Sequence, residues 1–168
     1  MAAVSFYDTT SDDRLRFAVV IAKYNGFWVF CKHKARRTYE LPGGRREAGE
    51  DIVSTAKREL WEETGASDFT LKPVCIYAVT GRTRAVPEGG ENLGMLFYAD
   101  IRAFGKLPQS GEMERIVLFA NPPDTPSYWT YPDIQPYLVR EYQRRYTNGK
   151  RSPSDKGGAS ASKKPYRK

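Results

Sequence analysis

A 23-residue segment that runs from Gly44 to Ala66 constrains this chain more than any other feature. It reads GRREAGEDIVSTAKRELWEETGA. Its middle predicts a helix over 51–64, because Asp51 can cap the first turn and Gly65 follows the last turn, where a left-handed residue is favoured. Four apolar side chains share one arc of this helix and are expected to face a core: Ile52, Val53, Ala56 and Leu60.

Three glutamates lie on the arc beside the apolar one, because Glu59 is three residues from Glu62 and four from Glu63. Like charges at these spacings cost a helix roughly 0.2–0.5 kcal/mol per pair. A divalent cation would offset that cost, and a cluster of carboxylate oxygens selects Mg²⁺, or Mn²⁺, over zinc. The alternative is an ordinary solvated acidic face with Lys57 and Arg58 as neighbours.

The spacing around this helix resembles the Nudix box, G-x5-E-x7-R-E-U-x-E-E-x-G-U, in which U is an apolar residue. Every defined position is filled, by Gly44, Glu50, Arg58, Glu59, Leu60, Glu62, Glu63, Gly65 and Ala66. The resemblance implies an α/β (α+β) fold, an α/β/α sandwich around a mixed β-sheet. It also implies hydrolysis of a nucleoside diphosphate linked to another group X.

The resemblance also implies roles for the box residues. The metal ligands would be Glu59, Glu62 and Glu63, with the main-chain carbonyl of Gly43 as a further ligand. Of these, Glu63 is the first choice for the essential carboxylate. Arg58 would hold one of the carboxylates by a bidentate contact. Glu50 would either join the metal shell or pair with Arg58.

The general base of this family often lies on a loop outside the box. The candidates here are Glu112 and Glu114, just before an expected strand at 115–119. We prefer Glu112, because it follows the flexible Gly111; an ordinary loop carboxylate is the alternative. Glu88 and Glu91 are weaker candidates.

Substrate contacts are less clearly marked in the sequence. Five residues are candidates: Arg36, Arg37, Arg82 and Arg84 for the phosphates and Tyr39 for stacking on a base. The competing interpretation is that the arginines are solvated and that the aromatic ring belongs to the core.

In the rest of the chain, runs of β-branched and aromatic residues predict strands at 15–22, 27–32, 71–79, 93–101 and 115–119. Apolar residues at helical spacing predict a second helix at 132–146. Asn25-Gly26 predicts a tight turn between the first two strands. The segments 33–40 and 81–92 are expected to be loops. Cys31 and Cys75 lie in apolar runs, so we expect buried, reduced thiols rather than a disulfide.

The net charge of +7 belongs mostly to one end of the chain. Seven basic residues and one acid fall in 147–168: Lys150, Arg151, Lys156, Lys163, Lys164, Arg167 and Lys168, with Asp155. We therefore expect a Nudix hydrolase domain at 1–146 and a basic disordered tail at 147–168. Nucleic acid is not an expected partner, apart from a weak, salt-sensitive contact of the tail.

No run approaches 18 apolar residues, and the first 13 residues lack a secretory signal. We expect a cytoplasmic protein with no membrane partner; homodimer formation stays open.

The primary hypothesis is a Mg²⁺-dependent pyrophosphohydrolase that cleaves (deoxy)nucleoside triphosphates, including oxidised ones such as 8-oxo-dGTP, to monophosphate and pyrophosphate. The segments 39–44, 94–100 and 117–119 look loosely like the bacterial 8-oxo-dGTP diphosphatase branch. The alternatives are an ADP-ribose or nucleotide-sugar pyrophosphatase, a nucleotide-sensing module without turnover, and an RNA-end hydrolase assisted by the tail.

Overall fold

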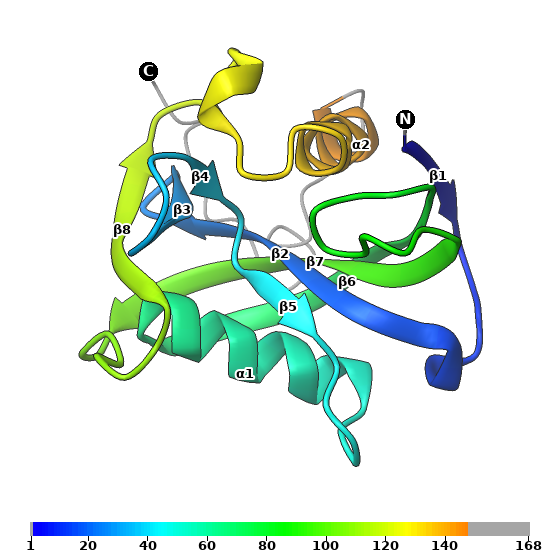
Figure 1. Ribbon diagram of the computed structural model, residues 1–168. Helices are drawn as coiled ribbons and strands as arrows, with labels where there is room; N and C mark the ends of the chain where they lie inside the picture. Colours follow the sequence, from blue (N-terminus) through cyan, green and yellow to red (C-terminus); the bar gives the residue numbers. More distant parts are fainter. Residues whose placement is uncertain (1, 148–168) are drawn as a thin grey trace.

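An eight-stranded mixed sheet separates two helices in the computed structural model, which describes residues 2–147 (Figure 1). The strands are β1 (Ala3–Tyr7), β2 (Leu15–Tyr24), β3 (Phe27–His33), β4 (Tyr39–Glu40), β5 (Gly43–Arg45), β6 (Ala66–Thr80), β7 (Glu91–Phe104) and β8 (Met113–Phe119). The α-helices are α1 (Ile52–Thr64) and α2 (Gln135–Thr147), and two 3₁₀ turns span Asp12–Arg14 and Pro126–Tyr128.

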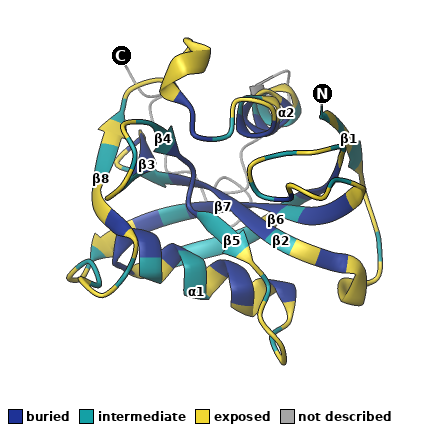
Figure 2. Ribbon diagram, viewed as in Figure 1, coloured by how far each residue is buried: buried dark blue, intermediate teal, exposed yellow. Residues whose placement is uncertain are grey.

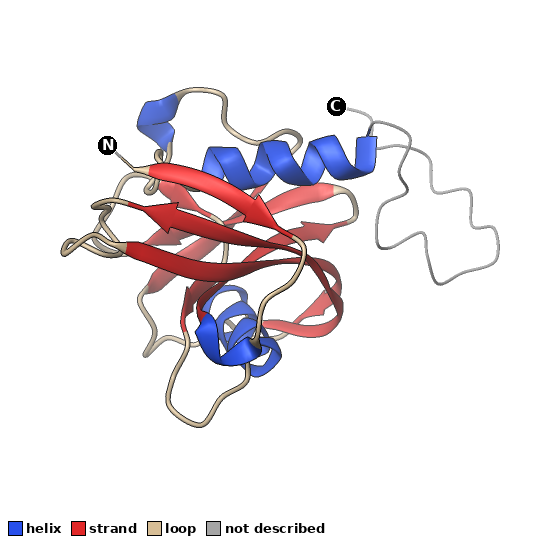
Figure 3. Cartoon of the chain, turned by 90° about the vertical axis from the view of Figure 1, so that its right-hand side faces the viewer, coloured by secondary structure: helices blue, strands red, loops and turns tan. Residues whose placement is uncertain are grey.

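The two helices cover opposite faces of the sheet (Figure 3). One core contains the buried α1 residues Ile52, Ala56 and Leu60 together with sheet residues. The other contains Leu138 and Tyr142 of α2, again with sheet residues. Figure 2 shows the buried positions running through the middle strands and along the helix sides that face them. This arrangement confirms the predicted α/β/α sandwich around a mixed sheet.

Strand β2 pairs along both of its edges. One edge runs parallel to β7 over nearly the whole strand. The other edge is shared by two antiparallel partners, β5 at 17–19 and β3 at 23–24 only. The predicted turn between β2 and β3 is confirmed, with positive φ angles of 47° at Asn25 and 84° at Gly26. Because β5 occupies one end of this edge, the glycines just before the helix lie against the centre of the sheet.

Helix α1 begins and ends as its sequence predicts. The Asp51 carboxylate accepts the N–H of Ser54 at 2.7 Å, and Gly65 closes the helix with a φ of 75°. One expectation was wrong: Val53 is 40% exposed. Thr55 takes the buried place instead, because its hydroxyl donates to the Asp51 carbonyl and to Glu50 and so needs no water.

Several boundaries differ from the predicted ones. The short strands β1, β4 and β5 were not expected: β1 and β5 are defined by pairing with strands far along the chain, and β4 is only two residues long and lies at the end of an expected loop. Strand β6 starts at Ala66 rather than 71, since it pairs with β7 along nearly its whole length. Helix α2 starts at Gln135 rather than 132 and includes Thr147. The rest of the predicted tail, 148–168, lies outside the described residues.

Both cysteines are buried and free, as expected. Within residues 2–147, no helix is long and apolar enough to cross a membrane.

Candidate active site

The centre of the site is a carboxylate at the end of α1. Glu63 is 8% exposed, and its Oε1 accepts the backbone N–H of Gly43 at 2.9 Å. Burial raises its pKa well above the usual range, with the neighbouring carboxylates Glu59 and Glu40 acting in the same direction. A group that is this costly to ionise in the protein alone is suited to a cation, which would favour its charged form.

Glu59 lies beside Glu63, and burial raises its pKa as well, against the opposing effect of Arg58. Side-chain hydrogen bonding links the two glutamates. A Cβ placed on Gly44 would collide with the Glu59 carboxylate. Because Gly44 has no side chain, it leaves the space that the Glu59 carboxylate occupies.

Arg58 holds the surrounding acids. Its guanidinium makes a bidentate contact with Glu50, at 2.6 Å and 3.0 Å. It also donates to Glu59 at 2.8 Å and to Glu62 at 3.2 Å. The bonds from Arg58 to Glu50, together with those from the Glu47 amide and Thr55, lower the pKa of Glu50 to about 2. Of the two roles expected for Glu50, the structure therefore shows the pairing with Arg58.

The residues present fit a hard cation by their chemistry. Glu59, Glu62 and Glu63 bring three carboxylates to the end of one helix, beside the Gly43 backbone. In residues 2–147, no three acidic, histidine or cysteine side chains already converge in coordinating positions. Glu59 and Glu62 instead face Arg58, and Glu63 faces the Gly43 amide. The set of metal ligands stays a prediction.

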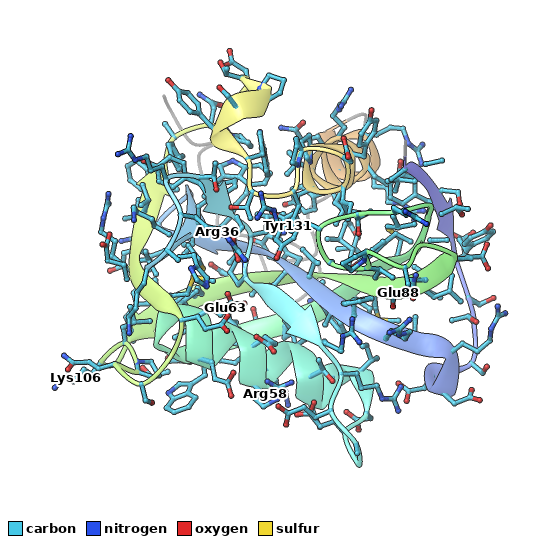
Figure 4. The ribbon with its side chains drawn as sticks, in the orientation of Figure 1. Arg36, Arg58, Glu63, Glu88, Lys106 and Tyr131 are labelled. Atoms are coloured by element: carbon cyan, nitrogen blue, oxygen red, sulfur yellow. The ribbon has the colours of Figure 1, made fainter. Side chains whose placement is uncertain are left out.

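These carboxylates line a polar cavity of about 560 Å³, here called the outer cavity. Its walls also include Arg36, Tyr131 and the loop from Pro108 to Glu112. In Figure 4, Glu63 lies between helix α1 and the Arg36 and Tyr131 side chains.

A second, mostly apolar cavity of about 240 Å³, here called the inner cavity, adjoins it. Its apolar walls come from β2, β6 and the 81–90 loop, and its polar groups include Asn92 and Gln135. Five residues line both cavities: Glu40, Gly43, Gly44, Arg45 and Tyr131. A ligand with an apolar end and a charged end can therefore occupy both cavities at once.

Sequence reasoning missed Glu40, which stands at the border of the two cavities. It is 5% exposed and pairs with Arg36 at 3.2 Å. Burial raises its pKa, against the lowering effects of Thr130 and Arg36. A charged residue directly before Leu41-Pro42-Gly43-Gly44 was the available signal. Tyr131 and Gln135 carried no such signal, because their contacts are made only in the folded chain.

The predicted substrate residues separate into two groups. Arg36 lines the outer cavity, and Arg84 lines a small hollow beside Tyr131. Arg37 and Arg82 are exposed and line neither cavity, and Tyr39 packs edge-on against Phe119 at 5.2 Å.

The candidate bases also differ in position. Glu112 lies at the rim of the outer cavity, with its side chain 84% exposed and 3.6 Å from His33 Nε2. Glu114 is drawn to Lys32 at 3.1 Å and lines neither cavity. Glu88 and Glu91 are exposed and line neither cavity.

Comparison with known proteins supports the same interpretation. A family model described as the NUDIX domain matches residues 12–130. The Bacillus subtilis (strain 168) protein YtkD, provisionally named an 8-oxo-dGTP diphosphatase, is 32% identical over 121 residues, 72% of each chain. The solved Bacillus subtilis pyrophosphohydrolase BsRppH is 27% identical, with a TM-score of 0.71 over 88% of this chain and 91% of its own.

A NUDIX hydrolase from Nitrosomonas europaea, 22% identical over 87% of this chain and 97% of its own, shares the fold with a TM-score of 0.61. The box, the sandwich and the family match agree, and the chain is a member of the Nudix hydrolase family, which acts on nucleoside diphosphates linked to a further group.

Proposed function

We propose that the protein is a Mg²⁺-dependent pyrophosphohydrolase of (deoxy)nucleoside triphosphates, with Mn²⁺ as an alternative ion. The observation that carries this proposal is that the two cavities adjoin and share five lining residues. The inner cavity has the size and apolar walls suited to a nucleobase. The outer cavity holds the carboxylates and Arg36, which suit a cation and a phosphate chain.

The residues divide the reaction among them. Glu59, Glu62 and Glu63, with the Gly43 carbonyl, would hold the cation, which when bound neutralises phosphate charge and polarises phosphoryl oxygens. Arg58 keeps the carboxylates in place, and Arg36 binds a phosphate.

Glu112 acts as the general base and accepts a proton from the attacking water. The water oxygen bonds to the α-phosphorus, the bond to the bridging oxygen breaks, and pyrophosphate leaves with that oxygen. The nucleoside monophosphate is the second product.

The similarity to YtkD supports oxidised guanine nucleotides such as 8-oxo-dGTP within the substrate range. The cytoplasmic location and the domain boundary at 146 stay predictions, and homodimer formation stays open.

The decisive experiment is an assay with Mg²⁺ and a panel of nucleotides, in which products are separated by chromatography. The panel contains dNTPs, 8-oxo-dGTP, ADP-ribose, nucleotide sugars and dinucleoside polyphosphates, and Glu63→Gln is the blank. Conversion of triphosphates to monophosphates by the wild type alone supports the proposal. Turnover of ADP-ribose or sugars instead contradicts it, and tight binding without any turnover points to a sensing module.

A further inference from the structure

The amide of Gln135 is held in one orientation at the wall of the inner cavity. Gln135 is 5% exposed, and its Oε1 accepts the backbone N–H of Leu41 at 2.8 Å. A backbone N–H can only donate, so the atom facing Leu41 must be the oxygen. The amide nitrogen, which can only donate, therefore points away from Leu41.

Asn92 is oriented by the same logic from a different part of the wall. It is 5% exposed, and its Oδ1 accepts a hydrogen bond from Arg16 Nη1. A guanidinium has no acceptor, so again the oxygen is engaged and the nitrogen is turned the other way. The Asn92 nitrogen makes only a long contact, 3.5 Å, with the Gly89 carbonyl.

Each amide nitrogen keeps at least one N–H that no described hydrogen bond uses. No described hydrogen bond uses the nitrogen of Gln135, yet no buried side-chain nitrogen or oxygen in residues 2–147 lacks a partner. The Gln135 nitrogen must therefore be accessible, and both residues line the inner cavity. Two amides on separate segments thus present hydrogen-bond donors, and no amide oxygen, to whatever occupies it.

We propose that Gln135 and Asn92 make the inner cavity selective for purines that carry an oxygen at C6 over those that carry an amino group there. A 6-oxopurine presents two adjacent acceptors, O6 and N7, to such donors. Adenine places its N6 amino donor beside N7, so a donor would face a donor. This inference rests on the proposed function, in which the inner cavity holds the nucleobase.

The other polar side chains that line the inner cavity are those of Tyr77, Thr83, Tyr131, Arg45 and Glu40. The hydroxyls of Tyr77 and Thr83 can rotate to donate or accept, so they impose no preference. Glu40 adds an acceptor at the border with the outer cavity. A 6-oxopurine has a donor at N1, whereas adenine has an acceptor there.

The test is the equilibrium binding of GMP, IMP and AMP, measured by titration calorimetry on the full chain. We expect GMP and IMP to bind about tenfold or more tightly than AMP, because a desolvated donor without an acceptor is costly. IMP lacks the 2-amino group of GMP, so its similarity to GMP assigns the preference to position 6. Equal or tighter binding of AMP would overturn the proposal.

The variant Gln135→Glu sharpens the test. It keeps an oxygen for Leu41 and replaces the cavity-facing donor by an acceptor, so the preference for GMP over AMP should shrink or reverse. Gln143→Glu is the matched control, because Gln143 lies on the same helix and lines neither cavity. A GMP-to-AMP ratio that is unchanged in Gln135→Glu would contradict the assignment.

Asn92→Asp is the second variant, since it keeps the oxygen for Arg16 and carries the same expectation if Gln135→Glu does not fold. Binding is measured without turnover, so the two proposals fail separately. Selective binding without hydrolysis of any nucleotide would support the inference and contradict the enzymatic proposal. Hydrolysis with no purine preference in binding would do the opposite.

Discussion

The carboxylate of Glu63 and the backbone amide of Gly43 are joined by a 2.9 Å hydrogen bond. This bond connects the last turn of α1 to β5 and holds the buried carboxylate of Glu63 in the wall of the outer cavity. It also leaves a neutral replacement able to keep the fold, since an amide oxygen can accept the same bond.

Replacing Glu63 with glutamine should change how stability depends on pH. The pKa of Glu63 in the folded protein is raised by burial, so the folded state holds a proton that the unfolded state releases near pH 4.5. In metal-free protein, the stability contributed by the protonated form is present below that pH and declines as the pH rises toward the folded pKa. Glu63→Gln should remove this decline.

Thermal unfolding from pH 4 to 8, with a chelator present, measures the effect. The difference between variant and wild type should grow with pH in favour of the variant. Parallel curves for the two proteins would show that Glu63 does not carry a buried proton.

The two glycines of β5 should fail in different ways when each is changed to alanine. A Cβ on Gly43 would collide with the backbone carbonyl oxygen of Ala18, so Gly43→Ala should destabilise the fold by about 1–3 kcal/mol. A Cβ on Gly44 would meet the movable carboxylate of Glu59 instead. Gly44→Ala should fold nearly as well.

For Gly44→Ala, the Mg²⁺ concentration needed for half-maximal turnover should rise about tenfold or more. Denaturant unfolding and Mg²⁺ titration of activity separate the two effects. Equal losses of stability in both variants would show that the Glu59 carboxylate cannot give way.

The variant Arg58→Lys keeps the positive charge and loses the planar guanidinium group that binds several carboxylates. We expect a loss of about 2 kcal/mol in the free energy of unfolding, less than for a fully buried pair because the Arg58 side chain is 20% exposed. Arg115→Lys is the control, since its contact with Glu114 is exposed and should matter by less than about 0.5 kcal/mol. Similarly small losses of unfolding free energy in both variants would show that Arg58 contributes no more to stability than an exposed arginine.

Glu112→Gln should lower kcat by about 10²–10⁴-fold at saturating Mg²⁺ if its carboxylate takes the proton of the attacking water. KM should change little, because Glu112 is not assigned to nucleotide binding. Glu114→Gln on the same segment is the matched control and should keep its activity. Unchanged turnover in Glu112→Gln would eliminate this residue as the base.

The helix and its acids could be predicted because their determinants are local. The Asp51 cap, the Gly65 end and the spacing of the glutamates depend on residues within four positions of one another. The sandwich followed from the resemblance carried by the same segment. Even there, Val53 was wrongly expected to face the core. The apolar arc of a helix does not show which of its residues the sheet covers.

The inner cavity could not be predicted, because its polar groups meet only after folding. Gln135 contacts Leu41 across 94 positions of sequence, and Arg16 contacts Asn92 across 76. Neither amide differs in sequence from an ordinary surface residue. Tyr39 shows the converse: its aromatic ring suggested stacking on a base, and the folded chain uses it against Phe119.

The two cavities are built from different stretches of chain and share only five lining residues. The outer cavity comes mainly from α1 and the 108–112 loop, whereas the inner cavity comes mainly from β2, β6, the 81–90 loop and the start of α2, and β5 lines both. Under the proposed function, substitutions in walls that belong to the inner cavity alone alter contacts with the nucleobase and leave the α1 carboxylates in place. Under the proposed function, this division allows substrate choice to evolve, or to be engineered, with little change to the residues that cut the phosphate bond.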